Sequence, residues 1–170
     1  MNQKITFTAA GTSAAIPATG LTSGVAYNAY FVAVDASANQ SPVYAPSGFT
    51  TADIVAPAVV AMLPANGAVD VAVDATLNLM FDEPVVIGTG SVIIREKVTD
   101  IIVATVAVNG TNITLSDADK TATIQTGVIL GSQTEYYVEV STGAFADAAG
   151  NKVTAISSPA AWAFRTANIG

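Results

Sequence analysis

The sequence predicts an all-β fold built as an antiparallel β-sandwich, and three observations predict it. Apolar and polar residues alternate with a period of two in short runs, which gives each run one buried face and one wet face. Turn-forming residues separate these runs, and no stretch keeps the spacing of an amphipathic helix. The chain has 170 residues and is 51% hydrophobic, so it has enough apolar material for a folded core.

The predicted strands follow from this alternation in chain order. Val, Ile and Thr fill the strands, and Gly, Asn, Asp and Pro fill the intervals. Alanine is frequent and favours helix, but it stands beside Val, Thr and Gly, so we interpret these stretches as small-residue strands. The clearest alternating runs are residues 5–8, 75–81, 112–115 and 137–140, and the turn signals are residues 22–24, 65–67, 109–110, 117–119 and 149–151.

Composition excludes several classes of function. The chain has no histidine and no cysteine, which removes Ser-His and Cys-His catalysis and the usual zinc sites. Its 13 acidic and 6 basic residues give a net charge of -7, so nucleic acid would be repelled. No apolar run reaches the roughly 18 residues of a membrane helix, and the first residues do not form a secretory signal. We therefore expect no nucleic-acid partner and no membrane span, in a chain that is either intracellular or a fragment.

The chain also repeats a pattern that indicates its organisation. Each copy has a leucine followed six residues later by a tyrosine, then an apolar strand, an Asp-to-Asn turn and a last strand that contains phenylalanine. In a sandwich this is the penultimate strand, a loop and the last strand, and the tyrosine takes the place of a tyrosine corner that ties the preceding loop to its strand. The copies are Leu21, Tyr27, Asp35, Asn39 and Phe49, and Leu130, Tyr136, Asp147, Asn151 and Phe164.

The distribution of charged residues divides the chain between the two copies of this pattern, after residue 52. Lys4 and Asp35 are the only charged residues within residues 1–52, so almost all charge lies in the second part of the chain. We predict a partial module at residues 1–52, a linker at 53–57 and a β-sandwich domain at 58–170.

A series of short motifs runs in order through the second part. They are Ala56-Pro57, Val59-Val60, Pro64 to Gly67, Leu77 to Val85, Tyr137 to Val140, Phe145 to Asn151 and Trp162 to Thr166. With this order and spacing, residues 56–166 resemble a bacterial Ig-like domain of the S-layer type. The resemblance implies an antiparallel Ig-like β-sandwich with a structural role.

Residues 11–52 resemble the C-terminal part of a fibronectin type III domain, through the run from Gly20 to Tyr27, Ala33 to Asp35, and Asn39 to Ser41. A complete domain of this kind needs roughly 90 to 100 residues and seven strands, and only about four strands fit before residue 52. The first strands of this partial fibronectin type III-like sandwich are therefore missing. The chain is a piece of a longer protein, or a neighbouring subunit completes the module, or the module docks on the second domain.

Carboxylates are the groups that remain for catalysis or metal binding. Asp82 and Glu83 are adjacent on a predicted strand and point to opposite faces, so they do not form an acid pair. Residues 117–119 and 147–151 offer alternating oxygen ligands, but calcium takes six to eight oxygens and neither loop supplies them alone. We assign no catalytic residue, no cofactor and no metal ligand. A fall in melting temperature with a chelator would be the sign of bound Ca²⁺.

The remaining aromatic residues have structural interpretations. Phe81, Trp162 and Phe164 have the spacing of core positions. We expect the other three tyrosines at solvent-facing positions, where three aromatics on one face would be the smallest strip that binds carbohydrate. They are Tyr30, Tyr44 and Tyr137.

Three functions fit these observations, and the chain is not expected to be an enzyme. The first is a non-catalytic spacer or adhesive module of a bacterial cell-surface or secreted multidomain protein, with neighbouring domains as partners and an extracellular location. The second is a self-assembling subunit of a surface layer or filament, in which identical subunits exchange strands at residues 1–52. The third is an accessory carbohydrate-binding module of a secreted polysaccharide-degrading enzyme, which would show an exposed aromatic strip and bind a glycan.

Overall fold

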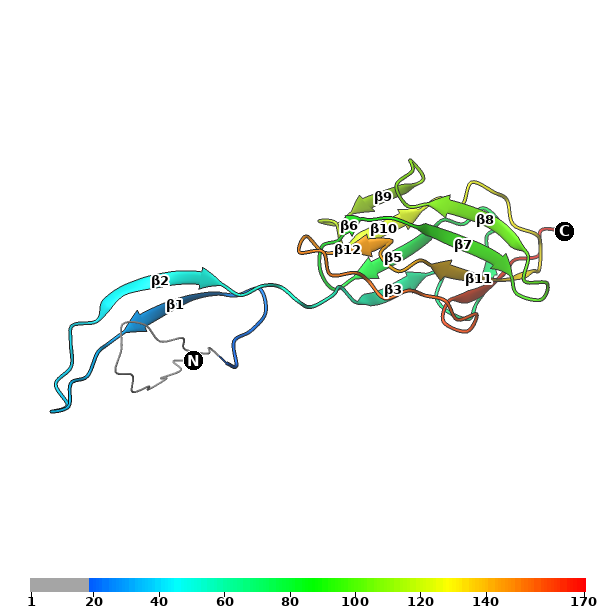
Figure 1. Cartoon of the computed structure of the whole chain (residues 1–170). Helices are drawn as coiled ribbons and strands as arrows, with labels where there is room; N and C mark the ends of the chain where they lie inside the picture. The colour runs from blue at the N-terminus through cyan, green and yellow to red at the C-terminus, as the bar shows by residue number, and fades with distance from the viewer. Residues whose placement is uncertain (1–18) are drawn as a thin grey trace. The chain divides into compact units, whose positions relative to one another are not determined.

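The computed structural model describes residues 19–170, apart from the side chains of residues 45–46. The chain divides into two units, Met1–Asp53 and Ile54–Gly170. All regular elements of the described residues are β-strands, which confirms the predicted all-β class (Figure 1). The run predicted at residues 5–8 lies outside the described residues.

The described part of the first unit contains a single hairpin. Strand β1 (Ala26–Phe31) pairs antiparallel with β2 (Tyr44–Thr50), and Tyr27 lies opposite Phe49. The register shifts between Ala29 and Phe31, so the hairpin bends there. A two-stranded hairpin alone is marginally stable in water, and a third strand or a second layer is needed for independent stability.

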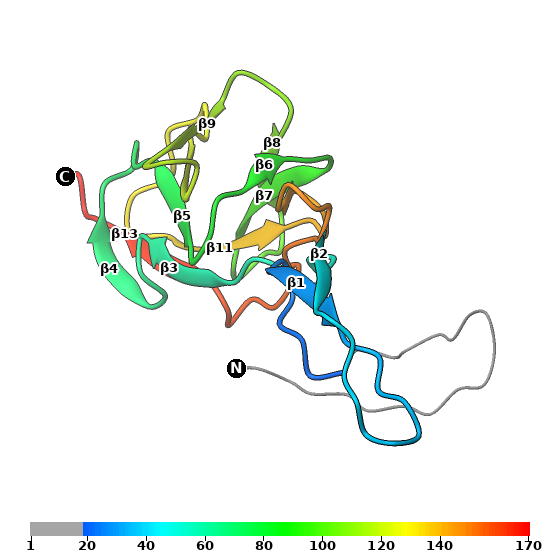
Figure 2. The same cartoon turned by 90° about the vertical axis from the view of Figure 1, so that its left-hand side faces the viewer.

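The second unit is a β-sandwich, and its strands can be followed in Figures 1 and 2. One sheet has the strand order β3-β5-β10-β9, and the other has the order β4-β13-β11-β7-β8. A short third sheet pairs β6 with β12. The first sheet contains β3 (Val59–Leu63), β5 (Leu77–Phe81), β10 (Thr121–Ile124) and β9 (Ile113–Ser116). The second contains β4 (Ala68–Val71), β13 (Ala163–Thr166), β11 (Glu135–Val140), β7 (Ser91–Glu96) and β8 (Ile102–Ala107), and the third contains β6 (Val86–Ile87) and β12 (Phe145–Ala146).

The core lies between the two main sheets. In β5 the buried residues are Leu77, Leu79 and Phe81, every second residue, as the period-two alternation predicts. Trp162 is 0% exposed, and its indole nitrogen donates a hydrogen bond to the Pro64 carbonyl at 2.8 Å. The predicted core positions Phe81, Trp162 and Phe164 are therefore confirmed.

One strand pair in the sandwich is parallel. After β3 the chain turns at residues 64–67 and crosses to the other sheet, where β4 runs in the same direction as β13. Phe164 lies opposite Ala68, and Thr166 lies opposite Val71. In chain order β4 is the first strand of the five-stranded sheet and β13 is the last, and the two are hydrogen-bonded neighbours.

Candidate functional surfaces

Asp82, directly after β5, accepts two hydrogen bonds from its own unit. Its Oδ1 accepts a hydrogen bond from the Ala58 amide at 2.8 Å. Its carbonyl oxygen accepts one from Lys120 Nζ at 2.9 Å. Glu83, the next residue, is half-buried. These contacts give Asp82 a structural role in fixing the start of β3 against the end of β5.

Residues 117–119 form the tight turn that joins β9 to β10. Asp117, Ala118 and Asp119 have φ angles of 55°, 51° and 63°, a conformation that aspartate tolerates better than most residues. The Asp117 carbonyl accepts a hydrogen bond from the Lys120 amide at 3.1 Å, and the Asp119 carbonyl accepts one from Val85 at 2.9 Å. All three side chains of the turn are exposed. The geometry therefore accounts for both aspartates as turn formers.

The Asp-to-Asn turns of the two units have the same hydrogen bonds. Asp147 Oδ1 accepts from the Asn151 amide at 2.8 Å, and its Oδ2 accepts from Asn151 Nδ2 at 2.7 Å. Asp35 accepts the corresponding bonds from Asn39 at 2.9 Å and 2.8 Å. In each turn the Asp amide also donates to the Asn carbonyl, at 3.0 Å in both. The sequence repeat is therefore a repeat of atomic contacts.

These contacts shift the pKa of both aspartates. Burial by itself would raise the pKa of Asp147, which is only 4% exposed, but the hydrogen bonds from Asn151 and its neighbours hold that pKa below its usual value. The Asn39 side chain lowers the pKa of Asp35, which is exposed. Both carboxylates are stabilised in the charged form by their own turns.

Four side chains of the five-stranded sheet and its β7–β8 turn form a polar network that the sequence analysis did not single out. Arg95 Nε donates to Glu139 Oε2 at 2.9 Å, and Arg95 Nη1 donates to the Asp100 carbonyl at 3.0 Å. The Tyr137 hydroxyl donates to Asp100 Oδ1, and Tyr137 lies directly opposite Arg95. The hydrogen bond to Asp100 and burial raise the pKa of Tyr137 to about 12. The network ties the β7–β8 turn to β11.

This network corrects the expectation for Tyr137. The residue points away from the core, as alternation predicted, but it is only 5% exposed. Tyr30 and Tyr44 are 62% and 74% exposed, as expected, and they lie in the other unit. In the described residues, therefore, these three tyrosines do not form an exposed strip on one sheet face. Alternation predicted which face of the sheet carries Tyr137. It could not predict that Arg95 of β7 and Asp100 of the β7–β8 turn would be its neighbours on that face.

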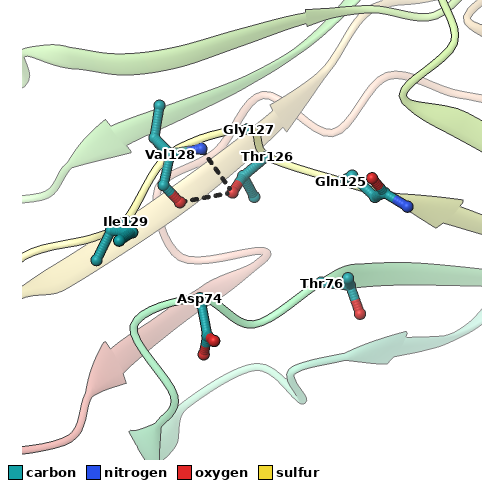
Figure 3. A pocket seen from close by; sticks show the side chains of 7 residues that line it. All are labelled: Asp74, Thr76, Gln125, Thr126, Gly127, Val128 and Ile129. Carbon is teal, nitrogen blue, oxygen red and sulfur yellow. Dashed lines mark hydrogen bonds between the residues drawn. The ribbon is translucent and has the colours of Figure 1, made fainter.

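A shallow hollow of about 280 Å³ lies between the β4–β5 and β10–β11 connections of the second unit (Figure 3). The Thr126 hydroxyl donates to the Val128 carbonyl at 3.1 Å, so it is directed to its own loop. The side chains in the hollow are polar or aliphatic, and an aromatic ring for sugar stacking is absent from this set. The lining residues are Asp74, Thr76, Gln125, Thr126, Gly127, Val128 and Ile129.

The predicted tyrosine corners are present in both units. The Tyr27 hydroxyl accepts a hydrogen bond from the Thr22 amide at 2.9 Å. The Tyr136 hydroxyl accepts one from the Gly131 amide at 2.8 Å. In both cases the tyrosine bonds to the residue five positions earlier, in the loop that leads into its strand. Both corners are therefore confirmed.

The strand that pairs with each corner tyrosine, β2 or β13, also makes matching contacts in the two units. The ring of Phe49 lies 6.0 Å from the ring of Tyr27, and the ring of Phe164 lies 6.0 Å from the ring of Tyr136. Two residues further on, a threonine hydroxyl donates to the carbonyl of the corner loop, Thr51 to Thr22 at 2.6 Å and Thr166 to Gly131 at 2.5 Å. We call β1–β2 and β11–β13, with these contacts, the two corner hairpins.

The corner hairpins differ in what covers them. Tyr136 and Phe164 are 4% and 3% exposed because the four-stranded sheet packs over them. Phe49 is 41% exposed and Phe31 is 45% exposed. Within residues 19–170, the corner hairpin of the first unit therefore presents aromatic side chains to solvent.

A comparison with known protein families agrees with the architecture of the second unit. Residues 53–166 match the family described as bacterial Ig-like domain. Among solved structures, the chain is similar to surface layer protein SbsC, domains 1-6, with 19% identity and a TM-score of 0.46 over 67% of this chain and 14% of that chain. It is similar to the N-terminal part of the bacterial S-layer protein SbsC with 19% identity and a TM-score of 0.44 over 66% of this chain and 24% of that chain.

The chain thus corresponds to a small part of the length of these structures. No curated protein matches it. The described residues also contain no helix of the length and apolarity that crossing a membrane requires.

Proposed function

Because the chain belongs to the bacterial Ig-like domain family, we propose that it is a non-catalytic structural module of a bacterial cell-surface or secreted multidomain protein, and that it acts as a spacer. One observation carries the proposal. The chain enters the second unit at one end and reaches its C-terminus at the opposite end (Figure 1). Segments attached at these two ends would therefore be held apart by the length of the unit.

The strand pairing of the second unit suits a spacer under tension. Strand β4 follows the start of the unit, β13 precedes its end, and the two strands are parallel neighbours. A load on the two ends acts first on β3, which pairs with β5, and beyond it slides β4 and β13 along each other, so that the hydrogen bonds of this parallel pair resist together. Gly67 N to Ala163 O, at 2.7 Å, and Ala167 N to Val71 O, at 2.8 Å, lie at the two ends of this pairing.

The polar groups of the unit support a structural role as well. In the described residues, each buried side-chain nitrogen or oxygen has a hydrogen-bond partner. Asp82, Asp117, Asp119 and Asp147 act within turns and strand ends, as described above, and the chain lacks histidine and cysteine. The roles of these four aspartates in turns and strand ends support a structural module.

Single-molecule force measurements test this proposal. The chain has no cysteine, so single cysteines introduced for attachment give defined pulling points. We expect a load between residue 54 and the C-terminus to meet severalfold higher resistance than a load between Ser132→Cys and the C-terminus. The second geometry peels β13 from β11, because Ser132 Oγ bonds to the Ala167 carbonyl at 3.3 Å beside the open end of that pair. Equal unfolding forces in both geometries would contradict a load-bearing spacer.

A further inference from the structure

The second unit shows how a corner hairpin is completed on its open side. Strand β11 has β13 on one edge and β7 on the other. Strand β7 runs antiparallel to β11, with the Lys97 amide bonded to the Glu135 carbonyl at 2.8 Å and the Ser141 amide bonded to the Ser91 carbonyl at 3.1 Å. In the first unit, among residues 19–170, β2 is the only strand that pairs with β1. The β7 position of the first unit is therefore open in the described structure.

The register of the hairpin identifies the backbone groups on this edge. The Thr51 amide donates to the Val25 carbonyl at 3.1 Å, so the backbone groups of alternate residues from Val25 onward face β2. Ala26, Asn28 and Tyr30 are then the residues whose amide and carbonyl groups face away from β2. Their counterparts in the second unit, Glu135, Tyr137 and Glu139, are the residues that β7 engages.

The side chains of β1 leave this edge without the usual protection. Natural proteins guard an edge strand with lysine, proline, a bulge or an inward charge. The strand Ala26–Phe31 contains no charged residue and no proline. The register shift between Ala29 and Phe31 places its extra residue on β2, because two steps along β1 face the three steps from Tyr44 to Ser47. Two copies of such an edge can approach without like-charge repulsion, and the edge offers no charge by which to select an oppositely charged partner.

The sequence of β1 is complementary to itself in one antiparallel register. When two β1 strands pair with Asn28 opposite Asn28, each large residue meets a small one. Tyr27 then lies opposite Ala29, and Tyr30 lies opposite Ala26. The residues whose backbone groups face the edge, Ala26, Asn28 and Tyr30, become the hydrogen-bonded pairs of this register. Hydrogen bonding and side-chain size therefore favour the same alignment.

From these observations we propose that a second copy of this chain binds the free edge of β1 through its own β1, antiparallel and centred on Asn28. The contact is isologous and closes as a two-fold dimer. It forms a four-stranded sheet in the order β2-β1-β1-β2, with Tyr27 and Phe49 of both copies on one face. Three or more strands are needed for a sheet to be stable on its own, and the four strands of the dimer satisfy this requirement, which the isolated hairpin does not. The inference does not depend on the spacer function, because it concerns the first unit alone.

Molar mass in solution tests the dimer. We expect light scattering after size exclusion to give a mass that rises from 17.1 kDa toward twice that value as the concentration of the full chain increases. The Asn28→Pro variant removes an amide that faces away from β2, so it keeps the hairpin bonds and should weaken dimerisation about tenfold or more. The Asn28→Thr variant keeps the amide and is the matched control, for which we expect dimerisation to be retained.

A crosslink keeps the test independent of how well the proline variant folds. In the proposed register the two Asn28 Cα atoms lie about 5.5 Å apart, within reach of a disulfide. Asn28→Cys should therefore give a disulfide-linked dimer on mild oxidation. Thr50→Cys lies on β2 opposite Ala26, so it is three strand spacings across and four residues along from its copy, roughly 20 Å in all, and should not. A monomer at every concentration with no Asn28→Cys crosslink would overturn the proposal, including the case in which residues 1–18 occupy the edge. Assembly that Asn28→Pro leaves unchanged, with equal crosslinking at both positions, would also overturn it.

Discussion

The corner hairpin β1–β2 of the first unit and the corner hairpin β11–β13 of the second have matching local contacts. In both, a tyrosine hydroxyl accepts a bond from the loop five residues earlier, and a phenylalanine ring lies 6.0 Å away on the neighbouring strand. Their surroundings differ: Phe164 is 3% exposed beneath a second sheet, whereas Phe49 is 41% exposed. The same hydrogen bonds are thus formed beneath a second sheet and, within residues 19–170, in a hairpin whose aromatic side chains are exposed.

The comparison separates local from long-range determinants of this fold. The corner contacts join residues of one loop and two strands that are close in sequence or directly paired, so a short stretch of chain specifies them. Burial comes from strands that are distant in sequence, because β5 and β10 belong to the opposite sheet of the second unit. Most of the stabilisation from apolar burial therefore belongs to the second hairpin alone.

The largest test of this difference is a matched pair of truncations. Phe164→Ala removes a buried ring from the core of the second unit and should lower its free energy of unfolding by about 3–5 kcal/mol. Phe49→Ala removes a ring that is already half in water, and we expect it to leave the second unit unchanged. Trp162 is the only tryptophan and is fully buried in the second unit, so its fluorescence during urea unfolding measures this stability directly. Equal midpoint shifts for the two variants would show that the hairpins share one cooperative core.

Removal of the corner hydroxyls should have a smaller effect in the same direction. Tyr136→Phe removes the 2.8 Å bond from the Gly131 amide, which is itself exposed, and takes a hydroxyl from a ring that is 4% exposed, so it should cost about 0.5–1.5 kcal/mol. Tyr27→Phe leaves the Thr22 amide where water can replace the lost partner, because Thr22 is exposed. Urea unfolding reports the first variant, and amide hydrogen exchange of Thr22 reports the second. A loss for Tyr136→Phe below about 0.5 kcal/mol would mean that this corner adds no more than an ordinary surface contact.

Much of the fold could be predicted from the sequence because its determinants are periodic or local. The alternation at residues 75–81 predicted β5, and the six-residue spacing from Leu130 to Tyr136 predicted the corner. The parallel pairing of β4 with β13 was not predicted, because it depends on a crossing between sheets after the turn at Gly67. The resemblance of residues 11–52 to a fibronectin type III domain stays a prediction.

The side-chain contacts of the second unit were less predictable for the same physical reason. Tyr137 was expected in solvent, but it is 5% exposed, its hydroxyl donates to Asp100 of the β7–β8 turn, and it lies opposite Arg95 of β7. The sequence held one indication of this polar network, because Arg95 and Glu139 have opposite charges and stand at outward positions of two strands. Sequence alone does not show that these two strands are neighbours. The turn contacts of Asp147 with Asn151 were accessible from sequence because only four residues separate the two.

The Asp-to-Asn turns allow the smallest and most specific comparison, which depends on pH. The pKa of Asp147 in the folded state is held below its usual value of about 3.9. Its charged form therefore stabilises the second unit fully above about pH 4. That contribution is lost as the pH falls through the lower folded-state pKa. Asp147→Asn cannot titrate and replaces one acceptor oxygen with a donor that faces Asn151 Nδ2, so we expect a lower melting temperature than the unsubstituted chain at neutral pH.

The two melting curves, followed by Trp162 fluorescence, should then approach each other as the pH falls toward 2. Asp35→Asn makes the same change in the exposed turn of the first unit, and the melting temperature of the second unit should not change at either pH. If the difference between Asp147→Asn and the unsubstituted chain were the same at neutral and acid pH, the role of Asp147 would be one of shape rather than charge. The turn of the second unit, in which Asp147 is buried, would then differ from its exposed copy in packing alone, because both carboxylates accept the same bonds from their asparagines.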